Sequence, residues 1–173
     1  MPILRLPRTH GCLVCGRDNP HGLQLQLFVD DASGVVNVDV TFSRNHIGFI
    51  DVIHGGVIAT VADEAMVWAA TWAGKRFCLC GELSIRYLKP ATPGVAYRFE
   101  ATVESKRSRL IATTLRVLDP NGIEIATASA KYLPLAASHH AKVVETFVDE
   151  PDSRSTARSL AGAVPSPGTP GEG

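Results

Sequence analysis

Much of the chain alternates apolar and polar residues with the period of two that is typical of half-buried β-strands. In LQLQLFV, for example, leucines alternate with glutamines. The pattern recurs in segments that we expect to be strands: 23–29, 36–42, 83–87, 97–103, 111–117 and 123–133. The later segments are joined by short turns, of which DPNG at 119–122 is a strong hairpin signal. Consecutive hairpins predict an antiparallel sheet.

One segment departs from this period. Residues 55–73 (GGVIATVADEAMVWAATWA) are rich in alanine, apolar on nearly every face and free of proline. These properties predict a buried helix. A single buried helix with one antiparallel sheet around it accounts economically for a chain of 173 residues. The expected fold class is therefore α+β.

Composition and charge exclude several classes of protein. Lys+Arg number 17 and Asp+Glu number 17, so no net charge draws the chain to nucleic acid or to an anionic membrane. A hydrophobic fraction of 45% fits one globular domain. No apolar run reaches the ~18 residues of a membrane span, and the N-terminus lacks the continuous apolar middle of a secretory signal. We expect a cytoplasmic protein whose four cysteines are reduced thiols.

Changes in composition divide the chain into parts. A cysteine-containing segment, 1–22, precedes a folded domain, 23–135, and then an arm or short helix, 136–150. The remainder, 151–173, is rich in proline, glycine and serine and ends in PSPGTPGEG. Such a segment cannot bury enough apolar area to offset its ordering entropy, so we expect a disordered and dispensable tail.

Two adjacent acids, Asp63 and Glu64, interrupt the predicted buried helix. An ionised carboxylate in an apolar setting is costly unless it is paired or faces a cleft. Adjacent helix positions point ~100° apart, so at most one of the two faces a given cleft. The other is then a solvated or ion-paired residue at a rim. The apolar neighbours of the pair favour a functional role for one of them.

The sequence His54-Gly55-Gly56 immediately precedes and opens this helix. Glycines at a helix start let a ligand approach the free backbone N–H groups, which could polarise a carbonyl or stabilise an oxyanion. The alternative is a tight turn in which glycine supplies only backbone freedom. Asp63 lies ~12 Å further along the helix, so both groups reach one carbonyl only if two chains combine.

These residues carry a resemblance to a known family. HGGVIATVADEAMVWAA followed by GELSIRYLKPATPG resembles the hotdog-fold acyl-CoA thioesterases, which include the hydroxybenzoyl-CoA and PaaI-type enzymes. The resemblance covers roughly residues 10–134. It implies a hotdog fold, an antiparallel sheet wrapped around one long central helix, in a homodimer or homotetramer with active sites at the dimer interface. It also implies hydrolysis of acyl-CoA to free acid and coenzyme A, with no metal and no cofactor.

The resemblance assigns roles to residues of the helix and its start. Asp63 matches the catalytic carboxylate, which acts as a general base on water or as a nucleophile. Gly55 matches the glycine whose N–H polarises the thioester carbonyl, and His54 and Gly56 shape the turn.

Other matched positions flank the helix. Asn45 is the candidate for an upstream asparagine that some members use, and His46 competes for that role. Before the strand that follows the helix, many members have serine or threonine where this chain has Cys80 and Gly81. These two residues are candidate substrate contacts that lack a water-orienting hydroxyl.

A basic cluster, Lys106, Arg107 and Arg109, lies at a predicted hairpin end. It is either a solvated turn or a contact for the coenzyme A phosphates, in which Arg107 and Arg109 would supply the planar guanidinium groups. Arg86 and Lys89 compete for the phosphate role.

CLVCGRDNPHGL near the N-terminus resembles an element found in some members of this family. Cys12 and Cys15 have the spacing of half a zinc site, and His10 and His21 could complete four ligands on paper. A redox pair is a further alternative. Because Cys78 and Cys80 do not supply the missing half-site, we expect a packed turn over the sheet and no metal.

Two other functions remain open on the sequence alone. One is an acyl-thioester hydratase or dehydratase, which would require His54 to take part in acid and base chemistry. The other is a non-catalytic acyl-CoA binding protein, which would bind ligand saturably without turnover.

Overall fold

The computed structural model describes residues 2–162. Its strands are β1 (Ile3–Arg5), β2 (Phe28–Asp30), β3 (Val36–Thr41), β4 (Ile47–Phe49), β5 (Val52–Ile53), β6 (Cys78–Tyr87), β7 (Ala96–Arg107), β8 (Leu110–Leu118) and β9 (Glu124–Pro134). Its helices are η1 (Arg44–His46), α1 (Gly55–Gly74), α2 (Ala137–Val144), η2 (Pro151–Ser153) and α3 (Arg154–Ala161).

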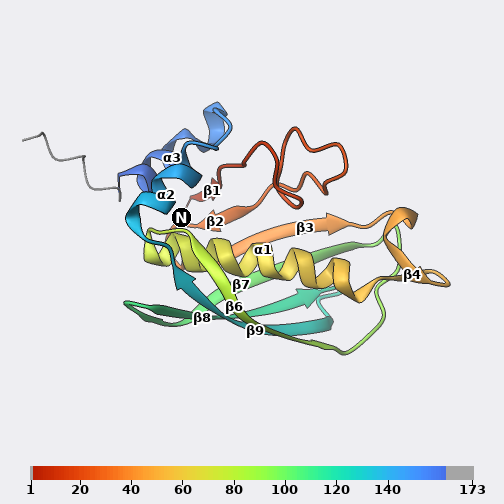
Figure 1. The fold of residues 1–173 in the computed structure, drawn as a ribbon. Helices are drawn as coiled ribbons and strands as arrows, with labels where there is room; N and C mark the ends of the chain where they lie inside the picture. The colour runs from red at the N-terminus through yellow and green to blue at the C-terminus, as the bar shows by residue number, and fades with distance from the viewer. Residues whose placement is uncertain (1, 163–173) are drawn as a thin grey trace, which may run out of the picture.

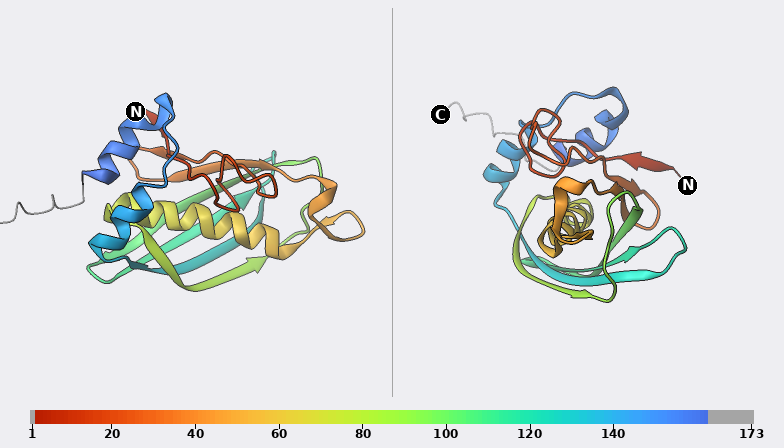
Figure 2. Two further views of the ribbon diagram at one scale, coloured as in Figure 1. Left: turned by 45° about the horizontal axis from the view of Figure 1, so that its top comes forward. Right: turned by 90° about the vertical axis from the view of Figure 1, so that its right-hand side faces the viewer.

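Seven strands form one antiparallel sheet around α1. Their order is β1-β2-β3-β7-β8-β9-β6, which leaves β1 and β6 at the two edges. Viewed along its axis, α1 lies inside the curve of the sheet, with the N-terminal segment across its other side (Figures 1 and 2). Alanines at fully buried helix positions allow close packing against the strands: Ala62, Ala65, Ala69 and Ala70. This arrangement confirms the hotdog fold.

The long periodic segments are predicted correctly, but the segment 23–29 is not. Only Phe28–Asp30 is a strand there, because Gln24 has a positive φ of 51°. Leu23 and Leu25 instead donate backbone hydrogen bonds to the cysteine-containing turn, each at 2.8 Å. Both side chains still pack against the core, as the alternation predicts.

The C-terminal segment is ordered further than its composition predicts. The expectation of disorder from residue 151 onward is wrong for 151–162, where η2 and α3 form and Leu160 has 0% exposure. Thr156 Oγ1 donates to the backbone oxygen of Arg5 at 2.7 Å, and His140 Nε2 contacts the backbone oxygen of Leu160 at 3.1 Å. The contacts of Thr156 and Leu160 therefore hold this segment on the fold, although its average composition is polar. The sequence PSPGTPGEG lies outside the described residues.

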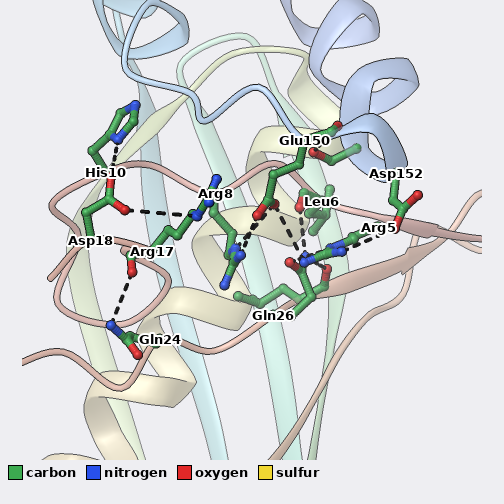
Figure 3. Close-up of polar contacts among 12 residues, drawn as sticks. Arg5, Leu6, Arg8, His10, Arg17, Asp18, Gln24, Gln26, Glu150 and Asp152 are labelled. Carbon is green, nitrogen blue, oxygen red and sulfur yellow. Dashed lines mark hydrogen bonds and ion pairs between the residues drawn. The ribbon is translucent and has the colours of Figure 1, made fainter. Parts of the chain in front are cut away.

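Ion pairs join this segment to the N-terminus. Glu150 contacts both Arg5 and Arg8, and Arg5 also contacts Asp152 (Figure 3). In Figure 1 the C-terminal helices lie beside β1, far from the end of α1 that is near β4. The N-terminal and C-terminal segments of the described chain thus contact each other away from the beginning of α1, and the beginning of α1 stays accessible.

Candidate active site

The beginning of α1 is built by the sequence His54-Gly55-Gly56. His54 caps the helix, since its Nδ1 accepts the backbone N–H of Gly56 at 2.9 Å. Within residues 2–162 the N–H of Gly55 has no hydrogen-bond partner. A Cβ at Gly55 would lie 3.1 Å from the Tyr87 hydroxyl, which donates to the Gly55 backbone oxygen at 2.6 Å. Glycine at position 55 therefore lets the Tyr87 hydroxyl approach the backbone closely, and its own N–H remains free to donate a hydrogen bond to a ligand.

A pocket of about 590 Å³ opens at this end of the helix. The beginning of α1, the β4–β5 hairpin and the residues after β6 form its walls. The lining is mainly apolar and includes one histidine and one lysine: Gly48, Phe49, Val52, Ile53, His54, Gly55, Ile58, Tyr87, Leu88, Lys89, Pro90 and Ala91. An apolar pocket lined by Gly55, whose N–H is free, suits a ligand that carries a carbonyl group.

Asp63 lies further along α1, where the side chain is half-buried. Its Oδ1 accepts the hydroxyl of Tyr132, on β9, at 2.7 Å. Burial, followed by the neighbouring Asp63 carboxylate, raises the pKa of the Cys80 thiol to about 11. The same two causes raise the pKa of Tyr132. At neutral pH the carboxylate therefore faces two protonated groups, and it can accept a proton or attack an electrophile.

Gly55 and Asp63 both lie beside β6 but at different points along it. Tyr87, at the end of the strand, contacts Gly55, whereas Cys80, near its beginning, lies at Asp63. Asp63 does not line the pocket at Gly55. Because both residues lie in α1, the helical rise separates the two groups by ~12 Å within one chain.

Asn45, His46 and Gly81, the remaining predicted site residues of this region, do not line the pocket at Gly55. Asn45 is exposed on η1 and does not line the pocket. His46 accepts the backbone N–H of Ser43 through Nδ1 at 3.1 Å, which completes a capping box. Gly81 lies at the bulge between Cys80 and Glu82, where a Cβ would meet Leu133 at 2.6 Å.

The basic hairpin lies at the other end of the molecule. Lys106 Nζ donates to the backbone oxygen of Ala73 at 3.1 Å, so the β7–β8 hairpin neutralises the carboxyl end of α1. Arg107 and Arg109 belong to this hairpin and lie far from the pocket at Gly55 in the same chain. Lys89 lines the pocket, whereas Arg86, the other competing candidate for the phosphate role, does not.

The N-terminal cysteines gather around the second acid of the helix. Cys12, Cys15 and Glu64 offer ligand atoms that all lie within 4.8 Å of one another. His10 and His21 are exposed and do not join this group. The structure therefore does not bring together the two cysteines and two histidines that could form a zinc site on paper.

Tyr132 and the pairing of Glu64 with the cysteines are the features that sequence reasoning missed. Tyr132 occupies an apolar position of an alternating strand, so its pattern indicates only a core residue. The expectation that the second acid is solvated or ion-paired at a rim is wrong for Glu64, which contacts Trp68 and Cys12 and forms no ion pair within residues 2–162. Its contact with Cys12 joins residues far apart in sequence.

The fold and the site together define a hotdog protein with a carboxylate on its central helix and a free backbone donor where that helix begins. The sequence model of the thioesterase superfamily matches residues 51–126. The chain is 30% identical over 114 residues to the protein named "Putative esterase" from Archaeoglobus fulgidus, which covers 66% of this chain and 68% of that protein. The chain belongs to the thioesterase superfamily.

Solved structures agree on the fold. The crystal structure of a thioesterase superfamily protein matches with a TM-score of 0.67 at 22% identity, over 72% of this chain and 63% of that chain. The Escherichia coli PaaI protein, from the phenylacetic acid degradation operon, matches with a TM-score of 0.61 at 18% identity, over 66% and 81%. A Streptococcus mutans protein bound to acetyl CoA matches with a TM-score of 0.60 at 19% identity, over 65% and 89%. None of the helices in residues 2–162 is long and apolar enough to cross a membrane.

Proposed function

We propose that the protein is an acyl-CoA thioesterase, which hydrolyses an acyl-CoA thioester to free acid and coenzyme A. The observation that carries the proposal is the placement of Asp63 and the free Gly55 N–H along the same open sheet edge. Membership of the thioesterase superfamily supports the reaction class. Fold relatives from Streptococcus mutans and Streptococcus pneumoniae, described with acetyl CoA and coenzyme A respectively, support the substrate class.

A second copy of the chain would complete the site. β6 is an edge strand, and large apolar side chains on or near it are exposed: Leu79 (61%), Leu133 (47%), Tyr87 (47%), Leu88 (44%) and Phe49 (71%). Antiparallel pairing of two β6 strands about their middle brings the Cys80 end of one strand beside the Tyr87 end of the other. Asp63 of one copy then approaches Gly55 of the other. We therefore propose a homo-oligomer, a dimer or a pair of dimers.

In the proposed reaction the thioester carbonyl accepts the Gly55 N–H, and the positive end of the α1 dipole stabilises the developing oxyanion. As a general base, Asp63 takes a proton from water as the new carbon–oxygen bond forms, and that proton passes to the departing thiolate of coenzyme A when the carbon–sulfur bond breaks. As a nucleophile, Asp63 forms an acyl anhydride while the carbon–sulfur bond breaks. Water then hydrolyses the anhydride, which releases the free acid, regenerates the Asp63 carboxylate and supplies the proton that the thiolate takes up. Water supplies the remaining atoms, so no metal or cofactor takes part in this reaction.

The test is a hydrolysis screen over short, long and aromatic acyl-CoAs that follows thiol release. Turnover of any of them supports the proposal. Saturable binding without thiol release would instead support a non-catalytic binding protein. Hydration of an enoyl thioester would support a hydratase, although His54 Nδ1 is already engaged by the Gly56 N–H.

Mixed oligomers provide a prediction for the composite site. Asp63→Asn subunits and Gly55→Pro subunits are each expected to be inactive, because one lacks the carboxylate and the other lacks the N–H. Proline is tolerated at the first position of a helix, but its Cβ would lie 3.1 Å from Tyr87, so circular dichroism must first show that Gly55→Pro is folded. Heterodimers of the two variants contain one intact site, and they should regain activity in the thiol-release assay. Folded, verified heterodimers that stay inactive would argue against a site shared between chains.

Lys89 provides a prediction for recognition of the nucleotide. Lys89→Ala should raise KM for acyl-CoA by about 2- to 10-fold, the scale of an exposed charged contact, and change KM far less for a truncated thioester that lacks the nucleotide. The wild-type KM for acyl-CoA should also rise with ionic strength, because salt screens the contact. Arg107→Ala and Arg109→Ala are the comparison variants. A larger KM effect from either arginine would assign the phosphates to the β7–β8 hairpin instead.

A further inference from the structure

The cluster of Cys12, Cys15 and Glu64 lies outside the proposed active site. The two cysteines belong to a turn of the N-terminal segment, and Glu64 projects toward them from α1. Glu64 points ~100° away from Asp63 around the helix axis, so the cluster and the proposed reaction occupy different faces of α1. Both oxygens of Glu64 lie 3.7 Å from Cys12 Sγ.

The cysteine turn is organised around the sulfur of Cys12. The backbone N–H groups of Val14 and Cys15 point at this sulfur, at 3.3 Å and 3.4 Å. The Gly16 N–H donates to the Cys12 backbone oxygen at 3.0 Å, and a Cβ at Gly16 would lie 2.1 Å from that oxygen. Glycine is therefore required to close the turn, and the turn presents donors that stabilise a thiolate rather than a thiol.

The carboxyl group of Glu64 lies against this turn and has no positively charged partner among the described residues. Its Oε1 accepts the indole N–H of Trp68 at 3.0 Å, and no lysine, arginine or histidine of residues 2–162 forms an ion pair with it. The Glu64 carboxyl group and the Cys12 sulfur thus face each other beside the buried Cys15.

We propose that Cys12, Cys15 and Glu64 bind a zinc ion, with a water molecule as the fourth ligand. Tetrahedral zinc with bonds of about 2.3 Å to sulfur and 2.0–2.2 Å to oxygen holds such ligand atoms about 3.5–3.7 Å apart. The separation of 3.7 Å between Cys12 Sγ and the Glu64 oxygens fits this geometry. The Trp68 N–H orients the carboxylate in the way that outer hydrogen bonds orient metal ligands.

Zinc accounts for all three residues, whereas a disulfide between the cysteines accounts for only two. A disulfide would remove the thiolates and leave the Glu64 carboxylate buried beside uncharged sulfur. A dication instead neutralises both Glu64 and the thiolates, and it displaces the proton of Cys15. The bound ion would also fix the N-terminal segment to the helix that carries Asp63.

The experiment uses the full chain, reduced and freed of metal with a chelator, and titrates it with Zn²⁺ against a competing indicator. We expect one Zn²⁺ per chain, and Co²⁺ in its place should give the intense thiolate-to-cobalt absorption. Glu64→Gln keeps the shape of the side chain and its acceptor for Trp68, and should weaken Zn²⁺ binding at least ~10-fold. Cys12→Ser should abolish tight binding, whereas Cys80→Ser, which changes a cysteine outside the cluster, should bind as the wild type does.

The readout is the stoichiometry and affinity of Zn²⁺ binding, so it is independent of whether the protein hydrolyses acyl-CoA. The proposal is wrong if the reduced chain binds no stoichiometric zinc, or if Glu64→Gln, shown to be folded by circular dichroism, binds Zn²⁺ with unchanged affinity. It is also wrong if Cys12 and Cys15 form a disulfide and, once reduced, still bind no metal. That last result would identify the pair as redox-active.

Discussion

Replacing Asp63 with asparagine is expected to lower kcat for acyl-CoA hydrolysis by at least ~100-fold, the scale on which a positioned base or nucleophile contributes. Asparagine has nearly the same shape and can still accept the Tyr132 hydroxyl that contacts Oδ1 at 2.7 Å. Its amide, however, cannot take a proton from water or attack the carbonyl. Thiol release under saturating substrate measures the effect.

Asp39→Asn is the matched control, because it makes the same chemical change at an exposed ion pair with Arg98. Such pairs contribute about 1 kcal/mol or less to stability, so kcat should be unchanged. Glu64→Gln should lower kcat far less than Asp63→Asn. The reverse ranking would mean that the other carboxylate of α1 performs the reaction.

Replacing Leu160 with alanine is expected to destabilise the fold by about 2–5 kcal/mol, the usual cost of truncating a fully buried leucine. Leu160 has 0% exposure and joins α3 to the core. For a chain of this size the melting temperature should fall by about 5–15 °C. Differential scanning calorimetry at fixed protein concentration measures the shift.

Ile123→Ala is the control for Leu160→Ala, since it removes aliphatic carbons from a side chain that is 43% exposed in the β8–β9 turn. Its melting temperature should stay within a few degrees of the wild type. An equally small effect of Leu160→Ala would restore the sequence-based expectation that the segment after Glu150 is dispensable.

Parts of the fold with a long hydrophobic period were predictable from the sequence. α1 is apolar on almost every face, and β7, β8 and β9 are at least nine residues long and alternate over most of their length, so each pattern indicates one structure. β1 spans three residues and shows no period of its own. Its strand conformation depends on pairing with β2, which is a tertiary contact that no local pattern encodes.

In the candidate site, too, residues with an unusual local sequence could be predicted, whereas contacts that depend on tertiary packing could not. Gly55 and Asp63 are recognisable because glycine at a helix start and an acid among apolar residues are unusual locally. The contact of Tyr132 with Asp63 depends instead on how β9 packs on α1, across 69 positions of sequence. The contact of Cys12 with Glu64 spans 52 positions, so a sequence motif reveals the cysteines but not the acid that faces them.

The contact between Thr156 and the Arg5 backbone has a consequence for synthesis of the chain. Its partners are 151 residues apart, so β1 must leave the ribosome long before the helix that it contacts. At about 5–20 residues per second that interval is about 8–30 s. During this time the N-terminal strand can pair only with β2, through three residue pairs. The body of the sheet therefore has time to fold before the two ends of the chain meet.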